Sequence, residues 1–292
     1  MEELLAPETL ARLERLVILA RRAPARRRKG LLPRRGRGIE PGSRREYTPG
    51  DDPRLLDWPA YARLERLLVK VTEELPEPRL ALVVDGSGSM GCGRPSPAAR
   101  ASLAAAGLAA CALARGARVE LTLAGAEPSG ARLTRPGQLV RLLGLLAAAR
   151  PDGTGRLAAA AERLAARARD RGAAVLFTDG LDPEDAQRAA LRLRNGGFTP
   201  AVVTVAVADE LDPAAEAAAL EAGEAELLAA ELPGGAASRV PFSAASLRKA
   251  AEVRQARRAR LEAGLRGVGV ELAALPPHEP FEQLALAWLR TS

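Results

Sequence analysis

Short apolar runs alternate with helix-length segments through the middle of this chain, and the alternation limits which folds are open to it. The apolar runs cover residues 80–84, 117–123, 173–178 and 201–207. Runs of this length without polar alternation are typical of strands that are buried on both faces of a parallel sheet. Because helices separate them, we predict an α/β fold with a doubly wound, mostly parallel sheet and helices on both faces.

Further elements are expected on either side of this core. Leucines at 10, 13, 16 and 19 indicate an amphipathic N-terminal helix, and Asp52-Pro53 is typical of the start of a short helix. Helices are predicted at residues 7–22, 96–114, 137–149, 156–169, 183–194, 244–264 and 279–290. Strands are predicted at residues 67–71 and 268–272, with a hairpin at 225–231 and 239–242. We divide the chain into residues 1–65, which hold the helix, a basic arm and a signature segment, and 66–292, the α/β domain.

The positive charge is concentrated in one basic arm. The formal net charge is +7, yet the stretch that begins at Arg21 and ends at Arg45 contains eleven Arg or Lys residues and one acidic residue, Glu40. Clustered guanidinium groups bind oxyanions, so nucleic acid, another polyanion or the surface of an anionic membrane are candidate partners of this arm. A solvated arm is the alternative. The arm lacks aromatic residues for base stacking, which disfavours nucleic acid.

Cysteine usage and hydropathy point to a cytoplasmic protein. Only Cys92 and Cys111 are present, without a CxxC pair, so neither a zinc site nor a disulfide framework is expected. The longest uncharged run, residues 101–114, is too short to span a bilayer, and the N-terminus lacks an export signal. We therefore expect no transmembrane segment.

A polar motif follows the first buried strand. The run 80–84 leads into Asp85-Gly-Ser87-Gly-Ser89, at the carboxyl edge of a strand, where open α/β sheets bind ligands. The two glycines allow unusual backbone angles, so one carboxylate and two hydroxyls can converge on one point. A hard cation binds such a set of oxygens.

Two further motifs fall where other loops of the same edge are expected. They are Asp152-Gly-Thr154-Gly, before a predicted helix, and Phe177-Thr-Asp179-Gly, after a buried strand. Asp85, Ser87, Ser89, Thr154 and Asp179 together resemble the metal-ion-dependent adhesion site of von Willebrand factor A domains. The resemblance implies Mg²⁺, or Mn²⁺ or Ca²⁺, held by the three hydroxyls, with both aspartates acting largely through water and a partner's carboxylate completing the site. The structural alternative treats all five as turn and capping residues.

A second resemblance lies upstream. The residues Gly36-Arg-Gly-Ile-Glu40, Arg45-Glu-Tyr47-Thr-Pro-Gly50-Asp-Asp52-Pro-Arg54-Leu-Leu-Asp57-Trp58, Ala62-Arg63 and Val69-Lys70 are similar to the signature of the bacterial family called domain of unknown function 58. That resemblance implies a von Willebrand factor A-like fold and an adaptor or co-chaperone role beside MoxR-type AAA+ ATPases. In that role the metal site would bind an acidic residue of the ATPase or of its client. From the residues alone, this segment is a structural clasp in which Arg54 and Asp57 pair and Trp58 is buried.

Two other functions compete with that of a non-enzymatic adaptor. A hydrolase would need a GxSxG elbow or a histidine near the serines. The residue two positions before Ser87 is Asp85 and not glycine, and the sole histidine, His278, lies far along the chain. No GxxxxGK[ST] loop is present, so nucleotide hydrolysis is not expected. The other rival, binding of nucleic acid or another polyanion through the basic arm, stays open as the alternative.

Overall fold

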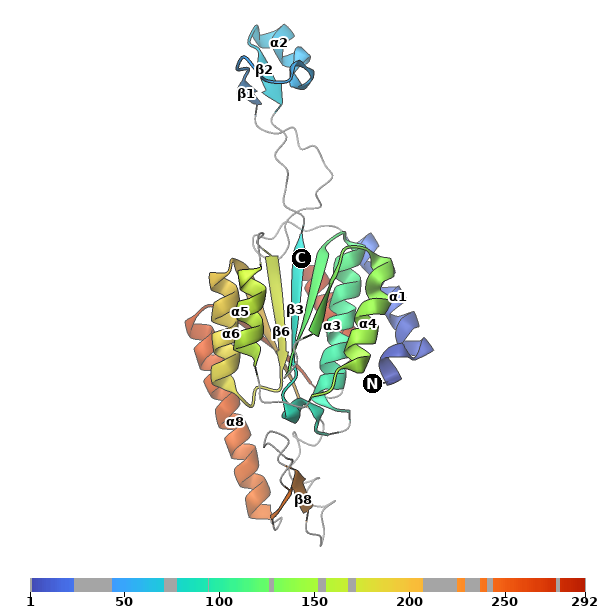
Figure 1. Cartoon of the computed structure of the whole chain (residues 1–292), viewed down its shortest axis with the longest axis vertical. Helices are drawn as coiled ribbons and strands as arrows, with labels where there is room; N and C mark the ends of the chain where they lie inside the picture. Colours follow the sequence, from blue (N-terminus) through green and yellow to red (C-terminus); the bar gives the residue numbers. More distant parts are fainter. Residues whose placement is uncertain are drawn as a thin grey trace.

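The structure, a computed structural model of the whole chain, has a six-stranded sheet at its centre (Figure 1). It describes residues 2–23, 44–70, 78–93, 95–125, 129–151, 156–167, 172–206, 225–228, 237–240, 244–276 and 279–291. The strand order is β10-β7-β6-β3-β4-β5. These strands are β3 (Arg79–Asp85), β4 (Arg118–Ala124), β5 (Ser129–Leu133), β6 (Gly172–Thr178), β7 (Phe198–Val205) and β10 (Glu271–Leu275). All neighbours pair in parallel except β5, which is antiparallel to β4.

Four helices cover one face of the sheet. They are α1 (Pro7–Arg22), α3 (Pro97–Ala114), α4 (Leu139–Ala148) and α9 (Phe281–Thr291). Their apolar side chains form one cluster with every second residue of the strands, such as Leu80, Leu82 and Val84 of β3. Short 3-10 turns, η1 (Glu2–Leu5) and η4 (Pro136–Gln138), flank α1 and α4. The N-terminal helix therefore packs on the sheet domain and is tied to α9 by an ion pair between Arg12 and Glu282.

Three of the described helices cover the opposite face. They are α5 (Leu157–Ala166), α6 (Pro183–Asn195) and α8 (Ala244–Gly267), and Figure 1 shows them on the other side of β3 and β6 from α3 and α4. They pack on the alternate residues of the strands, including Ala81 and Val83 of β3 and Leu176 of β6. Because both faces are covered, all residues of β3 and β6 are buried. The predicted α/β fold, with a mostly parallel sheet and helices on both faces, is confirmed.

Residues 44–70 form a small unit of their own. It consists of β1 (Arg44–Glu46) paired antiparallel with β2 (Leu68–Lys70), the 3-10 turn η2 (Pro53–Leu55) and helix α2 (Trp58–Leu64). The side chain of Asp52 caps η2, as the Asp52-Pro53 sequence indicated. The side chain of Asp57 caps α2. The prediction that Trp58 is buried is wrong: this side chain is 60% exposed. Trp58 is the first residue of a helix whose N-cap is the buried Asp57, and its exposed ring meets the ring of Tyr61 edge-on.

The last third of the chain contains a hairpin and the last sheet strand. β8 (Ala225–Leu228) and β9 (Ala237–Val240) pair antiparallel, as the predicted hairpin requires. They form a two-stranded sheet of their own and do not extend the central sheet. Strand β10 begins three residues later than its predicted position because Val268 and Gly269 form a turn after α8, and Gly269 has a positive φ of 65°. The basic arm between residues 24 and 43 lies outside the described part of the chain, so its predicted role remains a prediction.

Helix α3 is long and strongly apolar. It is the one described helix that is long and apolar enough to cross a membrane, but 83% of its apolar window is buried inside the molecule. Its apolar side chains pack against the sheet and against α1, α4 and α9. The apolar side chains of α3 therefore belong to the protein core.

Candidate metal site at the carboxyl edge of the sheet

The chain reverses its direction of travel across the sheet between β3 and β6. From β3 it proceeds to β4 and β5 on one side, and from β6 to β7 and β10 on the other. Ligands of open α/β sheets bind outside the carboxyl ends of the strands at such a switch point. Asp85 ends β3 and Asp179 directly follows β6. The structure thus brings these two predicted site residues to the same edge, at the point where a ligand is expected.

Asp85 is buried and held by two hydrogen bonds. Its Oδ1 accepts from the backbone N–H of Ser87 at 2.9 Å, and its Oδ2 accepts from the hydroxyl of Thr178 at 2.8 Å. Thr178 Oγ1 in turn accepts from the backbone N–H of Gly180 at 3.1 Å. The last residues of β3 and β6 are therefore joined through side chains as well as through the sheet ladder.

The loop after Asp85 brings the two serine hydroxyls together. Ser87 Oγ and Ser89 Oγ lie 3.2 Å apart, where the 3-10 turn η3 (Gly88–Gly91) begins. Gly86 lets this loop pass close to β4: its N–H donates to the carbonyl of Ala124 at 2.6 Å, and a Cβ at position 86 would lie 2.5 Å from that same oxygen. A side chain at position 86 would therefore push the serine loop away from the sheet.

The carboxylate of Asp179 is only half satisfied. Its Oδ1 accepts from the backbone N–H of Leu181 at 2.9 Å, whereas its Oδ2 is buried and has no hydrogen-bond partner among the residues that the structure describes. Burial, and then the negative charge of Asp179, raise the pKa of Asp85 from 3.8 to about 6, although hydrogen bonds from Ser87 and Thr178 oppose the shift. Among the described residues, no positively charged group contributes to this shift, so nothing there offsets the repulsion between the two carboxylates.

These residues fit a hard divalent cation. A cation between the strand ends would satisfy the Asp179 oxygen and offset the repulsion between the two carboxylates, and the serine hydroxyls are oxygen ligands of the right kind. Thr154, the fifth residue of the predicted set, lies outside the described residues. Within the described ranges, no group of three or more His, Cys, Asp or Glu side chains forms a metal cluster, so any cation here would depend on hydroxyls and only two carboxylates.

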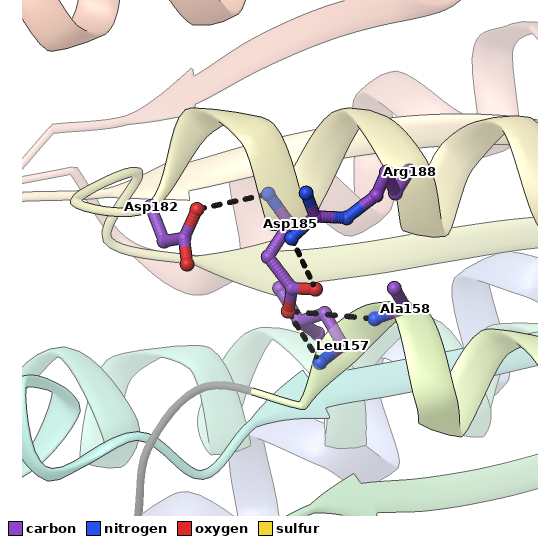
Figure 2. Close-up of polar contacts among 5 residues, drawn as sticks. All are labelled: Leu157, Ala158, Asp182, Asp185 and Arg188. Carbon is purple, nitrogen blue, oxygen red and sulfur yellow. Dashed lines mark hydrogen bonds and ion pairs between the residues drawn. The ribbon is translucent and has the colours of Figure 1, made fainter.

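Two contributors to this edge were not foreseen. Thr178 was assigned only to a strand, although a threonine directly before Asp179 is a signal that could have been used. Asp185 of α6 is the second: it is buried, and its Oδ2 accepts from the backbone N–H of Leu157 at 2.8 Å and of Ala158 at 3.4 Å (Figure 2). This carboxylate caps a neighbouring helix, α5, while Asp182 caps its own helix at the N–H of Asp185. Asp185 therefore fixes the start of α5, three residues after Thr154.

We expect the change Asp185→Ala to destabilise the protein by about 2 kcal/mol, because two helix-terminal N–H groups lose their acceptor in a buried position. Urea unfolding measures the loss. The matched control is Glu184→Ala in the same helical turn, whose exposed carboxylate makes only a 3.8 Å ion pair with Arg260, and which should change the stability by less than about 0.5 kcal/mol. Equal losses in both variants would show that the cap of α5 contributes nothing.

Together the fold and the polar cluster define a class: an α/β protein with a mostly parallel sheet and an oxygen-rich cluster of side chains at its switch point. The chain belongs to the family described as protein of unknown function DUF58, whose model matches residues 43–260. The family resemblance seen in the sequence is thereby confirmed.

The chain is also similar to several curated relatives and solved structures. Uncharacterized proteins of Mycobacterium tuberculosis and Mycobacterium bovis are each 34% identical over 165 residues, which cover 53% of this chain and 50% of the relative. The match thus spans about half the length of these relatives. The conserved hypothetical protein BatB of Bacteroides thetaiotaomicron aligns with a TM-score of 0.47 at 12% identity, over 74% of this chain and 100% of BatB. An aerotolerance-related membrane protein of Bacteroides fragilis aligns with a TM-score of 0.46 at 14% identity, over 73% of this chain and 98% of that protein.

Proposed function

We propose that this protein is a non-enzymatic, von Willebrand factor A-like adaptor that binds Mg²⁺ or Mn²⁺ at its switch point and captures an acidic residue of a protein partner. The observation that carries the proposal is the buried carboxylate of Asp85 beside the half-buried Asp179, whose Oδ2 has no partner among the described residues, next to the Ser87 and Ser89 hydroxyls. Such a set of side chains is costly without a cation and favourable with one.

The choice of side chains favours capture over catalysis. Neutral hydroxyls as the principal ligands withdraw little of the cation's positive charge, and two aspartates do not fill its coordination shell. The ion therefore keeps a strong affinity for one more carboxylate. In this proposal the residues Ser87, Ser89, Thr154, Asp85 and Asp179 hold the ion, and the partner supplies the remaining ligand.

The family resemblance suggests a MoxR-type AAA+ ATPase, or its client, as this partner. We expect the immobilised full chain to retain the MoxR-type ATPase from the same genome in Mn²⁺ or Mg²⁺ and to release it in EDTA. Asp85→Ala should reduce retention by about tenfold or more, because truncating one member of a buried charged site removes most of its binding energy. The matched control Glu252→Ala, which removes an exposed carboxylate of α8, should retain the ATPase as wild type does.

The retention experiment distinguishes capture through the cation from binding that needs no cation. Loss of retention in EDTA and in Asp85→Ala, but not in Glu252→Ala, supports capture through the cation. Retention that is the same in Mn²⁺ and EDTA, or the same for wild type and Asp85→Ala, would overturn the proposed mechanism.

A further inference from the structure

A wide groove lies on the sheet away from the candidate metal site. Its volume is about 1340 Å³, and its floor is made by β4 and β5. Helix α5 packs on β3 and β4, whereas α4 packs on the opposite face of β5, where Ala131 and Leu133 are buried. All of β5 contributes to the lining, with Gly130 and Arg132 on the face opposite to α4, and Arg141 of α4 belongs to the lining as well. The groove therefore exists because the described helices of this layer do not extend over the edge strand.

The lining of this groove is strongly cationic. It contains six arginines and one carboxylate: Arg79, Arg118, Arg132, Arg141, Arg163, Arg167 and Glu120. Glu120 lies at the floor, where it accepts from Arg79 and, at 3.2 Å, from Arg132. The groove already holds one carboxylate between two guanidinium groups, so its geometry suits that anion.

Three of the arginines are available for a ligand. Arg141 of α4 and Arg163 and Arg167 at the end of α5 are exposed. Among the described residues, every ion pair with a carboxylate involves an arginine other than these three. Like charges gathered in a concave surface attract anions more strongly than scattered ones do. Since lysine is absent from the lining, bidentate pairing with planar anions is favoured.

We propose that this groove binds an extended Asp- and Glu-rich segment of a second protein chain. Carboxylates are favoured over nucleic acid for two reasons. Glu120 shows a carboxylate held by the groove's own guanidinium groups, and the described lining contains no Phe, Tyr or Trp on which bases could stack. The groove lies on the β4–β5 floor rather than at the ends of β3 and β6, so it is distinct from the cation site and needs no metal.

The test uses the full chain in EDTA, which removes any binding of carboxylates through a cation. Deca-glutamate is the probe, and hydrogen exchange followed by mass spectrometry locates it. We expect saturating probe to slow exchange in β5 and α5 by about threefold or more. The double variant Arg163→Glu, Arg167→Glu should abolish this protection. The double variant Arg163→Gln, Arg167→Gln should already weaken it. The matched control is Arg254→Glu with Arg258→Glu, the same spacing and charge change on α8, which should leave the protection intact.

Protection of β5 and α5 that is lost only in the groove variants supports the proposal, even when the basic arm also binds the probe elsewhere. Unchanged exchange in these two segments at saturating probe would overturn it. Equal protection in wild type and both groove variants would overturn it as well. Protection by a DNA duplex at a concentration about tenfold lower than that of deca-glutamate would reassign the groove to nucleic acid.

Discussion

Saturating Mg²⁺ or Mn²⁺ is expected to raise the free energy of unfolding of the wild-type chain by about 2.7 kcal/mol at a concentration one hundred times the dissociation constant. A cation that binds the folded site and not the unfolded chain stabilises the fold by mass action. The Asp85→Asn variant should gain less than about 0.5 kcal/mol under the same conditions, because the site then holds one negative charge instead of two. Urea unfolding with and without the ion measures both values.

In EDTA at neutral or higher pH, Asp85→Asn should be the more stable of the two proteins. Folding raises the pKa of Asp85 from 3.8 to about 6, so the folded chain binds a proton more tightly than the unfolded chain. The stability contributed by this group is therefore present below pH 3.8 and is lost as the pH rises through about 6, a loss on the order of 3 kcal/mol. At pH 8 without metal, Asp85→Asn should exceed the wild type in stability by about 2 kcal/mol, and the difference should vanish near pH 4.

The exposed carboxylate of Glu252 provides the control, since Glu252→Gln should follow the wild type in both conditions. If the ion stabilises wild type and Asp85→Asn by the same amount, it binds elsewhere. If Asp85→Asn is less stable than wild type in EDTA at pH 8, the hydrogen bonds of the Asp85 carboxylate stabilise the fold by more than its burial destabilises it. The buried charge would then need no cation, and the argument for the metal site would fail.

Local sequence pattern predicted the elements whose environment is uniform along their length. Strands β3 and β6 are buried at every position, so their apolar runs appear directly in the sequence. Strand β5 was missed because it is short and because one of its faces carries Gly130 and Arg132, which look like a loop. Its strand character comes from pairing with β4, a contact that periodicity does not report.

The candidate site was predictable only as far as its motifs are local. The sequence placed Asp85, Ser87 and Ser89 in one loop, and the rule for strand ends brought Asp179 to the same edge. Partners distant in sequence were not seen: Thr178 lies 93 residues from Asp85, and Asp185 lies 28 residues from Leu157. Such contacts depend on how helices and strands pack, which a pattern of residue types does not specify.

Arg100 is another such residue, and it connects the carboxyl edge of the sheet to α3. Its guanidinium donates to the carbonyls of Ala206 at 2.7 Å, Leu275 at 3.3 Å and Glu279 at 3.2 Å, and also to that of Pro276. These carbonyls follow β7, end β10 and precede α9. Within an alanine-rich helix the arginine would be expected on the solvent face, yet it is 6% exposed. One side chain therefore satisfies backbone groups from three elements.

We expect Arg100→Met to lower the free energy of unfolding by about 3 to 5 kcal/mol. Methionine fills much of the volume but removes the guanidinium from all four carbonyls. Those of Leu275 and Pro276 keep a backbone N–H donor, whereas those of Ala206 and Glu279 lose the donor that the described residues give them. Unsatisfied buried acceptors cost about 1 to 3 kcal/mol each when water cannot reach them. Arg100→Lys should lose about half as much, since one ammonium reaches fewer of the carbonyls. Urea unfolding measures the three proteins.

The matched control for this change is Arg257→Met. Arg257 is an exposed arginine of α8 that donates to a single carbonyl, that of Leu181, at 2.8 Å, so its loss should cost less than about 0.5 kcal/mol. A loss below about 1 kcal/mol for Arg100→Met would mean that water replaces the guanidinium at these carbonyls. In that case the end of β10 would be held by its ladder to β7 and by the packing of α9, and the carboxyl edge that carries Asp85 and Asp179 would not depend on α3 for its shape.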